Sequence, residues 1–179
     1  MSEQAVILVL NSGSSSIKFD LYAGMAEICK GQISGLGDKP RLRIMDCREE
    51  RKWTRDLSPQ EGMDHETALL ALLSELQGIT GSLTVEAVGH RIVHGGHLHS
   101  RPRLIDSDLI KELELLIPLA PLHQPHNLSG VYAAEKAFPD AKQVACFDTA
   151  FHRHHPWVND TFALPSSFYE EGIRRYGFH

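Results

Sequence analysis

The residues with the clearest chemical potential lie between two apolar runs near the start of the chain. They form the string Asn-Ser-Gly-Ser-Ser-Ser-Ile-Lys, which begins at Asn11. Glycine accepts a positive φ, so Gly13 predicts a tight turn between two strands that a ligand can approach closely. Four serine hydroxyl groups, with the N–H groups of the turn, can donate to phosphate oxygens: those of Ser12, Ser14, Ser15 and Ser16. Lys18 adds a positive charge, and the Asn11 amide oxygen suits a metal ion or its water shell. An ordinary hairpin turn explains one or two of these residues but not the whole group.

A second candidate is the arginine in the string Gly-His-Arg-Ile-Val-His-Gly-Gly, which begins at Gly89. Arg91 lies within an otherwise apolar strand, where a guanidinium needs an anionic partner. Its planar fork fits a carboxylate or a phosphate through two parallel hydrogen bonds. A structural ion pair inside the domain and a bound anionic ligand both meet that need. Gly95 and Gly96 favour the ligand, because they would let the backbone approach it closely.

Two later strings contribute a histidine and a carboxylate. His123 lies in Ala-Pro-Leu-His-Gln-Pro, where nearby prolines predict a stiff loop that can hold the ring in one place. A surface histidine and a catalytic one are equally compatible with this setting. Asp148 follows an apolar strand in the string Cys-Phe-Asp-Thr-Ala-Phe, either as a site carboxylate or as a turn residue.

Composition excludes several classes of function. The net charge of −5 and the pI near 6.1 argue against a nucleic-acid partner. The three cysteines form no Cys-x-x-Cys pair, which argues against a disulfide framework or a thiolate zinc site and favours the cytoplasm. Neither a signal peptide nor a bilayer-spanning segment is recognisable, so we expect no membrane partner.

The elements that must position these residues follow from the periodicity of apolar residues. The predicted strands cover residues 5–10, 17–22, 26–34, 41–47, 52–57, 85–93 and 143–147. The predicted helices run from a cap at Asp64 to Gly78, from Asp106 to Pro118, from a cap at Asn127 to Pro139 and over residues 165–172. Late strands separated by helices predict parallel crossovers and a mixed α/β sheet. Ligands gather at the carboxyl ends of such strands, where Arg91 and Asp148 fall.

The four chemical strings, in this order and with the closing Gly-Phe-His, resemble the N-terminal half of the acetate/propionate kinase family over essentially the whole chain. That family shares a superfamily with sugar kinases, actin and heat-shock chaperones. The resemblance implies an actin-like, ribonuclease H-like mixed sheet with flanking helices, as one lobe of a two-domain kinase. It also implies a core sheet in residues 1–150, the start of a linking segment in residues 151–179, and an absent C-terminal nucleotide domain.

The resemblance implies a role for each matching residue. Three would be catalytic, as the acid and the histidines at the transferred phosphoryl group: Asp148, His123 and His179. Four would bind the acyl substrate, one through its carboxylate and the others through its methyl group: Arg91, Val93, Leu122 and Phe178. Lys18 would contact ATP, and Asn11 would belong to a magnesium site. Gly13, Ser14 and Ser16 are expected at the phosphates from the chemistry of their turn.

The implied reaction is reversible transfer of the ATP γ-phosphoryl group to acetate, which gives acetyl phosphate and ADP. Mg²⁺ would be the cofactor, Mn²⁺ could replace it, and the parent protein would be a homodimer that pairs through the absent domain. Propionate kinase activity is the alternative within the family. The resemblance implies that propionate kinases carry a smaller residue at this position, so Val93 favours acetate. One methylene in such a pocket is worth roughly 1–3 kcal/mol. The 179-residue chain alone is expected to be inactive.

Two other classes of function stay open at this point. A histidine-based metalloenzyme would use one of two clusters: His94, His97 and His99, or His152, His154 and His155. A non-catalytic interaction fragment is the other. The chain also departs from the family pattern, because Gln124 replaces the usual asparagine, His154 and His155 replace other residues, and the chain stops at His179.

Overall fold

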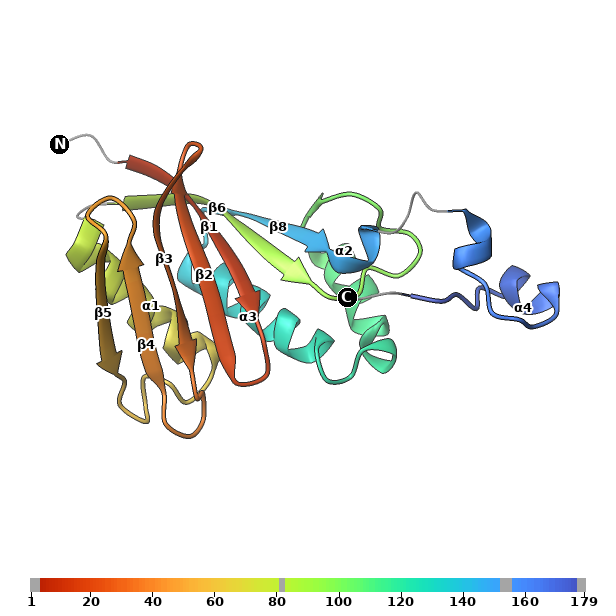
Figure 1. The fold of residues 1–179 in the computed structure, drawn as a ribbon, viewed down its shortest axis with the longest axis horizontal. Coiled ribbons are helices and arrows are strands. Elements are labelled where there is room, and N and C mark those ends of the chain that lie inside the picture. Colours follow the sequence, from red (N-terminus) through yellow and green to blue (C-terminus); the bar gives the residue numbers. More distant parts are fainter. Residues whose placement is uncertain (1–3, 81–82, 152–155, 177–179) are drawn as a thin grey trace.

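One eight-stranded sheet, with strand order β5-β4-β3-β2-β1-β6-β8-β7, organises the chain (Figure 1). The computed structural model describes residues 4–80, 83–151 and 156–176. Its strands are β1 (Gln4–Ser12), β2 (Ser16–Ala23), β3 (Ala26–Ser34), β4 (Arg41–Asp46), β5 (Arg51–Asp56), β6 (Leu83–Ile92), β7 (Arg103–Leu104) and β8 (Lys142–Phe147). Its α-helices are α1 (His65–Thr80), α2 (Ser107–Leu115), α3 (Gln124–Ala137) and α4 (Ser166–Glu170).

The direction of the strands confirms the predicted mixed sheet. Neighbouring strands from β1 to β5 are antiparallel, whereas β6 runs parallel to β1 and β8 runs parallel to β6. The carboxyl ends of β1, β6 and β8 therefore meet at one edge. The two-residue strand β7, antiparallel to β8, was not predicted, because two residues carry no periodicity.

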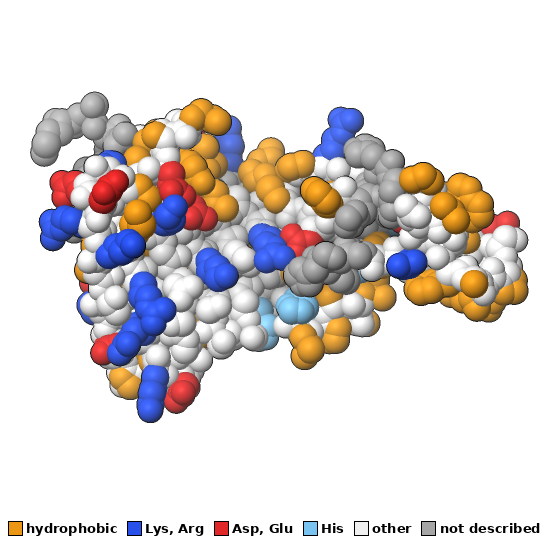
Figure 2. Space-filling view, viewed as in Figure 1, with side chains coloured by type: hydrophobic (Ala, Val, Ile, Leu, Met, Phe, Trp, Pro, Cys, Tyr) orange, Lys and Arg blue, Asp and Glu red, His pale blue; other side chains and the backbone are white. Residues whose placement is uncertain are grey.

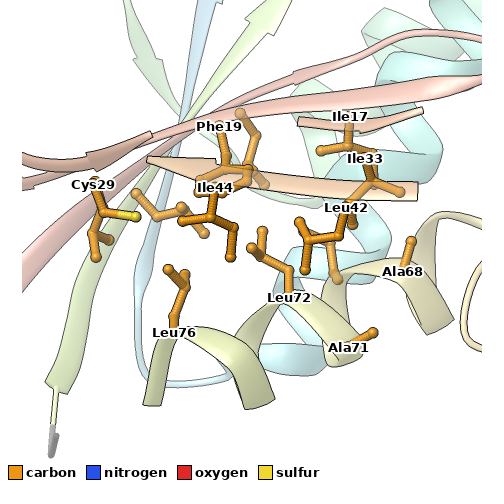
Figure 3. Packing of buried hydrophobic residues seen from close by; sticks show 14 of the residues in the cluster. Ile17, Phe19, Cys29, Ile33, Leu42, Ile44, Ala68, Ala71, Leu72 and Leu76 are labelled. Carbon is orange, nitrogen blue, oxygen red and sulfur yellow. The ribbon is translucent and has the colours of Figure 1, made fainter. Parts of the chain in front are cut away.

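The main core lies between the sheet and helices α1 and α3, which lie together behind the sheet in Figure 1. Alternate residues of β2 point into this core, so Phe19 is buried while Lys18 is exposed. Figure 3 shows Leu72 and Leu76 of α1 facing Ile44 of β4. Burial of each such side chain stabilises the fold by roughly 1.5–3 kcal/mol.

The helix ends differ in part from the sequence prediction. The Asp64 carboxylate accepts a hydrogen bond from the Thr67 N–H at 2.8 Å, which confirms the predicted cap of α1. The helix continues past Gly78 to Thr80, so the predicted stop is wrong; one glycine costs only about 1 kcal/mol within a helix. Asp106, predicted to begin α2, is its N-cap residue, so the predicted start is confirmed to within one residue.

Helix α2 ends at Leu115, before the predicted end at Pro118, which instead lies in the short 3-10 helix Ile117–Leu119. A proline disfavours helical backbone in the residue before it, which explains the earlier end. Within the described part of the chain, no helix has both the length and the apolar character that crossing a membrane requires.

Candidate active site

A pocket of about 380 Å³ lies where β1, β6 and β8 end and α3 begins. Its lining residues are Asn11, Ser12, Gly13, Ser16, Lys18, Arg91, Val93, His123, Asn127 and Asp148. Most of the predicted site residues therefore come together, although they arise from distant parts of the sequence. Figure 2 shows basic, acidic and histidine side chains close together near the middle of the visible face.

Two predicted residues are placed differently, and two more are not described. Ser14 is exposed and Leu122 is 76% exposed, and neither is among the residues that line this pocket. Phe178 and His179 lie outside the described residues. The roles of these four stay predictions.

The turn after β1 is closed by a hydrogen bond from the Gly13 N–H to the Ser16 carbonyl oxygen, at 2.8 Å. The β1–β2 register sets Asn11 directly opposite Lys18, so both side chains point to the same face of the sheet. The amide oxygen and the ammonium group can thus act on the same ligand.

A buried histidine at the start of α1 forms a hydrogen bond with this turn. Nε2 of His65, the first residue of α1, lies 2.9 Å from the Gly13 carbonyl oxygen. Burial lowers the pKa of His65, which favours the neutral ring with its proton on Nε2 and a hydrogen bond donated to Gly13. The ring stacks on His126 of α3 with 6.0 Å between centroids, so α1, α3 and the turn are in contact.

Arg91 and Asp148 form an ion pair in the pocket. Nε of Arg91 lies 3.0 Å from each carboxylate oxygen of Asp148, and Nη2 lies 2.7 Å from Oδ2. The side chains are 41% and 19% exposed, respectively, and the hydrogen bonds to Asp148 raise the pKa of Arg91. A guanidinium has five N–H donors, and these contacts use one on Nε and one on Nη2. The ion pair and a further anionic ligand can therefore coexist on Arg91.

The segment after β6 is held by side chains rather than open to a ligand. Four successive backbone N–H groups donate to side-chain acceptors: Val93 to Asn127 Oδ1 at 2.9 Å, His94 to Gln124 Oε1 at 3.3 Å, Gly95 to Thr149 Oγ1 at 2.9 Å and Gly96 to His94 Nδ1 at 2.9 Å. The expectation that Gly95 and Gly96 let a ligand reach the backbone is therefore wrong.

These two glycines are required for structural reasons, Gly95 by the packing around it and Gly96 by its backbone conformation. A Cβ atom at Gly95 would lie 2.7 Å from the Phe147 ring, and Gly96 has a φ of 64°. Val93 itself lies one residue beyond the end of β6, and it lines the same pocket as Arg91.

Helix α3 contributes residues that the sequence reading missed. Asn127 was expected to cap this helix, but the helix begins at Gln124 and Asn127 lies in its first turn. The buried amide accepts from the Val93 N–H, and its Nδ2 donates to the Ser12 carbonyl oxygen at 2.7 Å. The available signal was spacing, because residues four apart on a helix share a face, and Asn127 follows His123 by four.

His123 is the exposed N-cap residue of α3, and Pro125 lies in the first turn. The start of a helix therefore mounts this ring, not the stiff loop predicted from the prolines. Proline is well tolerated at this position, since the first N–H groups of a helix have no partner within it. The positive end of the helix dipole also points toward the pocket, which favours an anionic ligand there.

The described residues contain no group of three or more His, Cys, Asp or Glu side chains that could hold a metal ion. In the first proposed histidine cluster, His94 accepts from the Gly96 N–H and His99 lies 2.8 Å from Glu112. The second cluster falls on residues 152–155, outside the described residues. For Mg²⁺ the pocket offers Asn11 and Asp148 as oxygen ligands, and one or two protein ligands with substrate phosphates and water suit that ion.

Comparison with known proteins decides the family. The Acetokinase family pattern matches residues 6–179. The chain belongs to the acetokinase family. It is 44% identical to the acetate kinase of Methylocella silvestris over 97% of the chain and 46% of that protein, and 43% identical to the acetate kinase of Rhodopseudomonas palustris over 97% and 45%.

Solved structures of acetokinase family members agree with the fold. The crystal structure of Porphyromonas gingivalis acetate kinase matches with a TM-score of 0.86 and 37% identity, over 98% of this chain and 45% of that one. A propionate kinase from Francisella tularensis matches with a TM-score of 0.85 and 32% identity, over 97% and 44%. The actin-like mixed sheet with flanking helices is thus confirmed, and the chain spans about half the length of the curated relatives it matches.

Proposed function

We propose that the protein containing this chain transfers the γ-phosphoryl group of ATP reversibly to acetate, giving acetyl phosphate and ADP. One observation carries the proposal: a single pocket holds Arg91, whose guanidinium fits a carboxylate, together with Lys18 and the Gly13 turn, which fit phosphate. The acceptor and the donor of the reaction can therefore lie side by side.

In the proposed reaction, the N–H groups of Arg91 that do not contact Asp148 hold the acetate carboxylate. One acetate oxygen attacks the γ-phosphorus in line, the bond from phosphorus to the bridging oxygen of ADP breaks, and ADP leaves with that electron pair. Acetate is ionised at neutral pH, since carboxylic acids titrate near pH ~4, and no general base is needed. Such transfers depend mostly on positioning and charge stabilisation.

The remaining pocket residues would act on the phosphates. Lys18 and the hydroxyl group of Ser16 would hold them at the turn, and His123 would donate to the transferred group. Asn11 and Asp148 would hold Mg²⁺ or Mn²⁺, which when bound neutralises phosphate charge. Asp148 would also orient Arg91 through the ion pair.

The proposal also includes Ser14 and Leu122, which do not line the pocket, and two residues outside the described part of the chain. Ser14 would assist phosphate binding, Leu122 and Phe178 would complete the methyl pocket, and His179 would contact the transferred group. Residues 1–179 would form one lobe, with its core sheet in residues 1–150. Because the curated relatives are about twice as long, further residues would bind the adenosine part of ATP. The whole protein would be a cytoplasmic homodimer.

A chimera tests the proposal: residues 1–179 followed by the remaining part of the Methylocella silvestris acetate kinase. We expect it to form acetyl phosphate, trapped as the hydroxamate, from ATP, Mg²⁺ and acetate, whereas residues 1–179 alone form none. Arg91→Ala should lower kcat/KM for acetate by at least about tenfold, the value of one charge-assisted hydrogen bond. A chimera that binds ATP but phosphorylates neither acetate nor propionate would refute the proposal.

Propionate kinase activity is a second candidate, and two observations keep it in view. Val93 lines the pocket beside Arg91, so its size bears on the length of the acyl group that fits. One structural neighbour is titled a propionate kinase. The ratio of kcat/KM for acetate and propionate in the chimera separates the two, and we expect acetate to be preferred.

A further inference from the structure

Asn127 joins two segments of the pocket that no strand pairing connects. The parallel pairing of β1 with β6 ends at Leu10 and His90. Beyond those residues the two segments are no longer paired with each other; one leads into the turn at Gly13 and the other to Val93. The Asn127 amide lies between them and bonds to the Val93 N–H at 2.9 Å and to the Ser12 carbonyl oxygen at 2.7 Å.

The chemistry of this contact requires a carboxamide. Asn127 is 4% exposed, so each of the two backbone groups would lose a hydrogen bond without access to water if the amide were removed. An amide supplies one acceptor and two donors, whereas a carboxylate of the same shape only accepts and an apolar side chain does neither. The side chain therefore acts as a spacer of fixed length between the two segments.

Helix α3 holds this spacer rigidly in place. Gly130 lets the helix approach β1 closely, because a Cβ atom there would lie 2.1 Å from Ser12 Oγ. One turn before Asn127, the buried Gln124 amide donates to the carbonyl oxygens of His94 at 3.0 Å and Leu113 at 3.2 Å. Leu128 and Val131 of the same helix are buried in the second core cluster. The position of the helix thus sets the gap between the two ends of the pocket.

We propose that Asn127 is a positioning residue that sets the distance between the acceptor end of the pocket, at Arg91 and Val93, and the phosphate-binding turn at Gly13. This inference rests on the proposed function. In a direct transfer, the attacking oxygen must lie close to and in line with phosphorus, and an error of about 1 Å can cost roughly a hundredfold in rate. Asn127 itself contacts neither reactant in this proposal.

The test uses Asn127→Asp, which keeps the acceptor for Val93 but loses the donor for Ser12. Amide proton exchange in residues 1–179, measured by NMR, should rise at least about tenfold at Gly13 and stay nearly unchanged at Val93. The variant loses the hydrogen bond to the Ser12 carbonyl oxygen, which belongs to the same peptide unit as the Gly13 N–H, and keeps the one from the Val93 N–H. Asn159→Asp makes the same chemical change at an exposed position and should alter neither amide. Equal changes at both amides, or none, would overturn the positioning role.

Catalysis in the chimera gives the second readout. Asn127→Asp should lower kcat roughly 10- to 100-fold while KM for acetate stays within about threefold, because Arg91 and Val93 keep their positions. An unchanged kcat would overturn the inference. If the unaltered chimera transfers no phosphoryl group but the asymmetric exchange is seen, the proposed function fails and the spacer role of Asn127 stands.

A second variant covers the case in which Asn127→Asp does not fold. Asn127→Gln keeps both donor and acceptor and adds one methylene, so it lengthens the spacer without removing its chemistry. We expect faster amide exchange, by about tenfold, at Gly13 or Val93 and a lower kcat. Unchanged exchange at both amides with unchanged kcat would again overturn the proposal.

Discussion

Replacement of Arg91 by lysine separates the shape of this side chain from its charge. Arg91 spans Asp148 with two nitrogens, Nε at 3.0 Å from both oxygens and Nη2 at 2.7 Å from one of them. The opposite edge of the guanidinium can then hold the acetate carboxylate. A lysine ammonium is a single point charge, so it cannot span Asp148 and also present a planar fork to acetate.

The expected magnitude follows from the hydrogen bonds that are lost. Arg91→Lys removes at least one charge-assisted hydrogen bond to acetate, worth about 1.5–3 kcal/mol, or roughly 10- to 150-fold in binding. The Arg91 side chain is 41% exposed, and solvent screens the interaction, so we expect the lower end of this range. KM for acetate in the chimera should rise about 10- to 30-fold, with KM for ATP nearly unchanged.

The assay is the initial rate of acetyl hydroxamate formation at a series of acetate concentrations and saturating ATP. Arg101→Lys is the matched control, because Arg101 is exposed and is not among the residues that line the pocket. An unchanged KM for acetate in Arg91→Lys would refute the assignment of this guanidinium to the acetate carboxylate. In that case the guanidinium serves only the ion pair with Asp148.

Three further predictions concern the pocket and the core. Val93→Ala should shift the ratio of kcat/KM values about tenfold toward propionate, because two methyl carbons leave the pocket; a constant ratio would remove Val93 from the acyl site. Burial lowers the pKa of His90 to about 4, so the unfolded chain binds a proton there at a higher pH than the folded one. The free energy of unfolding should keep its full value above pH ~6.5 and fall by about 3 kcal/mol as the pH drops to ~4. Urea unfolding at several pH values tests this, and His90→Asn should reduce the loss; an equal loss in the variant would contradict it. Leu72→Ala, in the fully buried face of α1, should cost about 2–5 kcal/mol in urea unfolding, whereas the exposed Leu70→Ala should cost well under 1 kcal/mol; equal costs would contradict the observed packing.

The sequence by itself determined the elements of the sheet and most of the pocket. Continuous apolar runs predicted β1, β6 and β8, and alternating apolar residues predicted strands such as β2 and β4, because the burial of a strand is a local property of side-chain polarity. The helix–strand alternation predicted parallel crossovers, and these bring the ends of β6 and β8 together. The expectation that Arg91 and Asp148 lie at the same edge followed from that order, whereas the Gly13 turn was predicted from its own residues.

The tertiary structure decided which groups bond to one another. Sequence chemistry left the partner of Arg91 open between an ion pair and a ligand, and only the pairing of β6 with β8 brings Asp148 to it. The role of Gly95 depended in the same way on the position of the Phe147 ring. Asn127 bonds to Ser12 across 115 positions of the chain, a contact set by the packing of α3 against two strand ends. The periodicity of apolar residues indicates only which face of a helix or strand is buried. Hydrogen bonds between distant residues, such as Asn127 and Ser12, can be identified only once the packing of α3 against the strands is known.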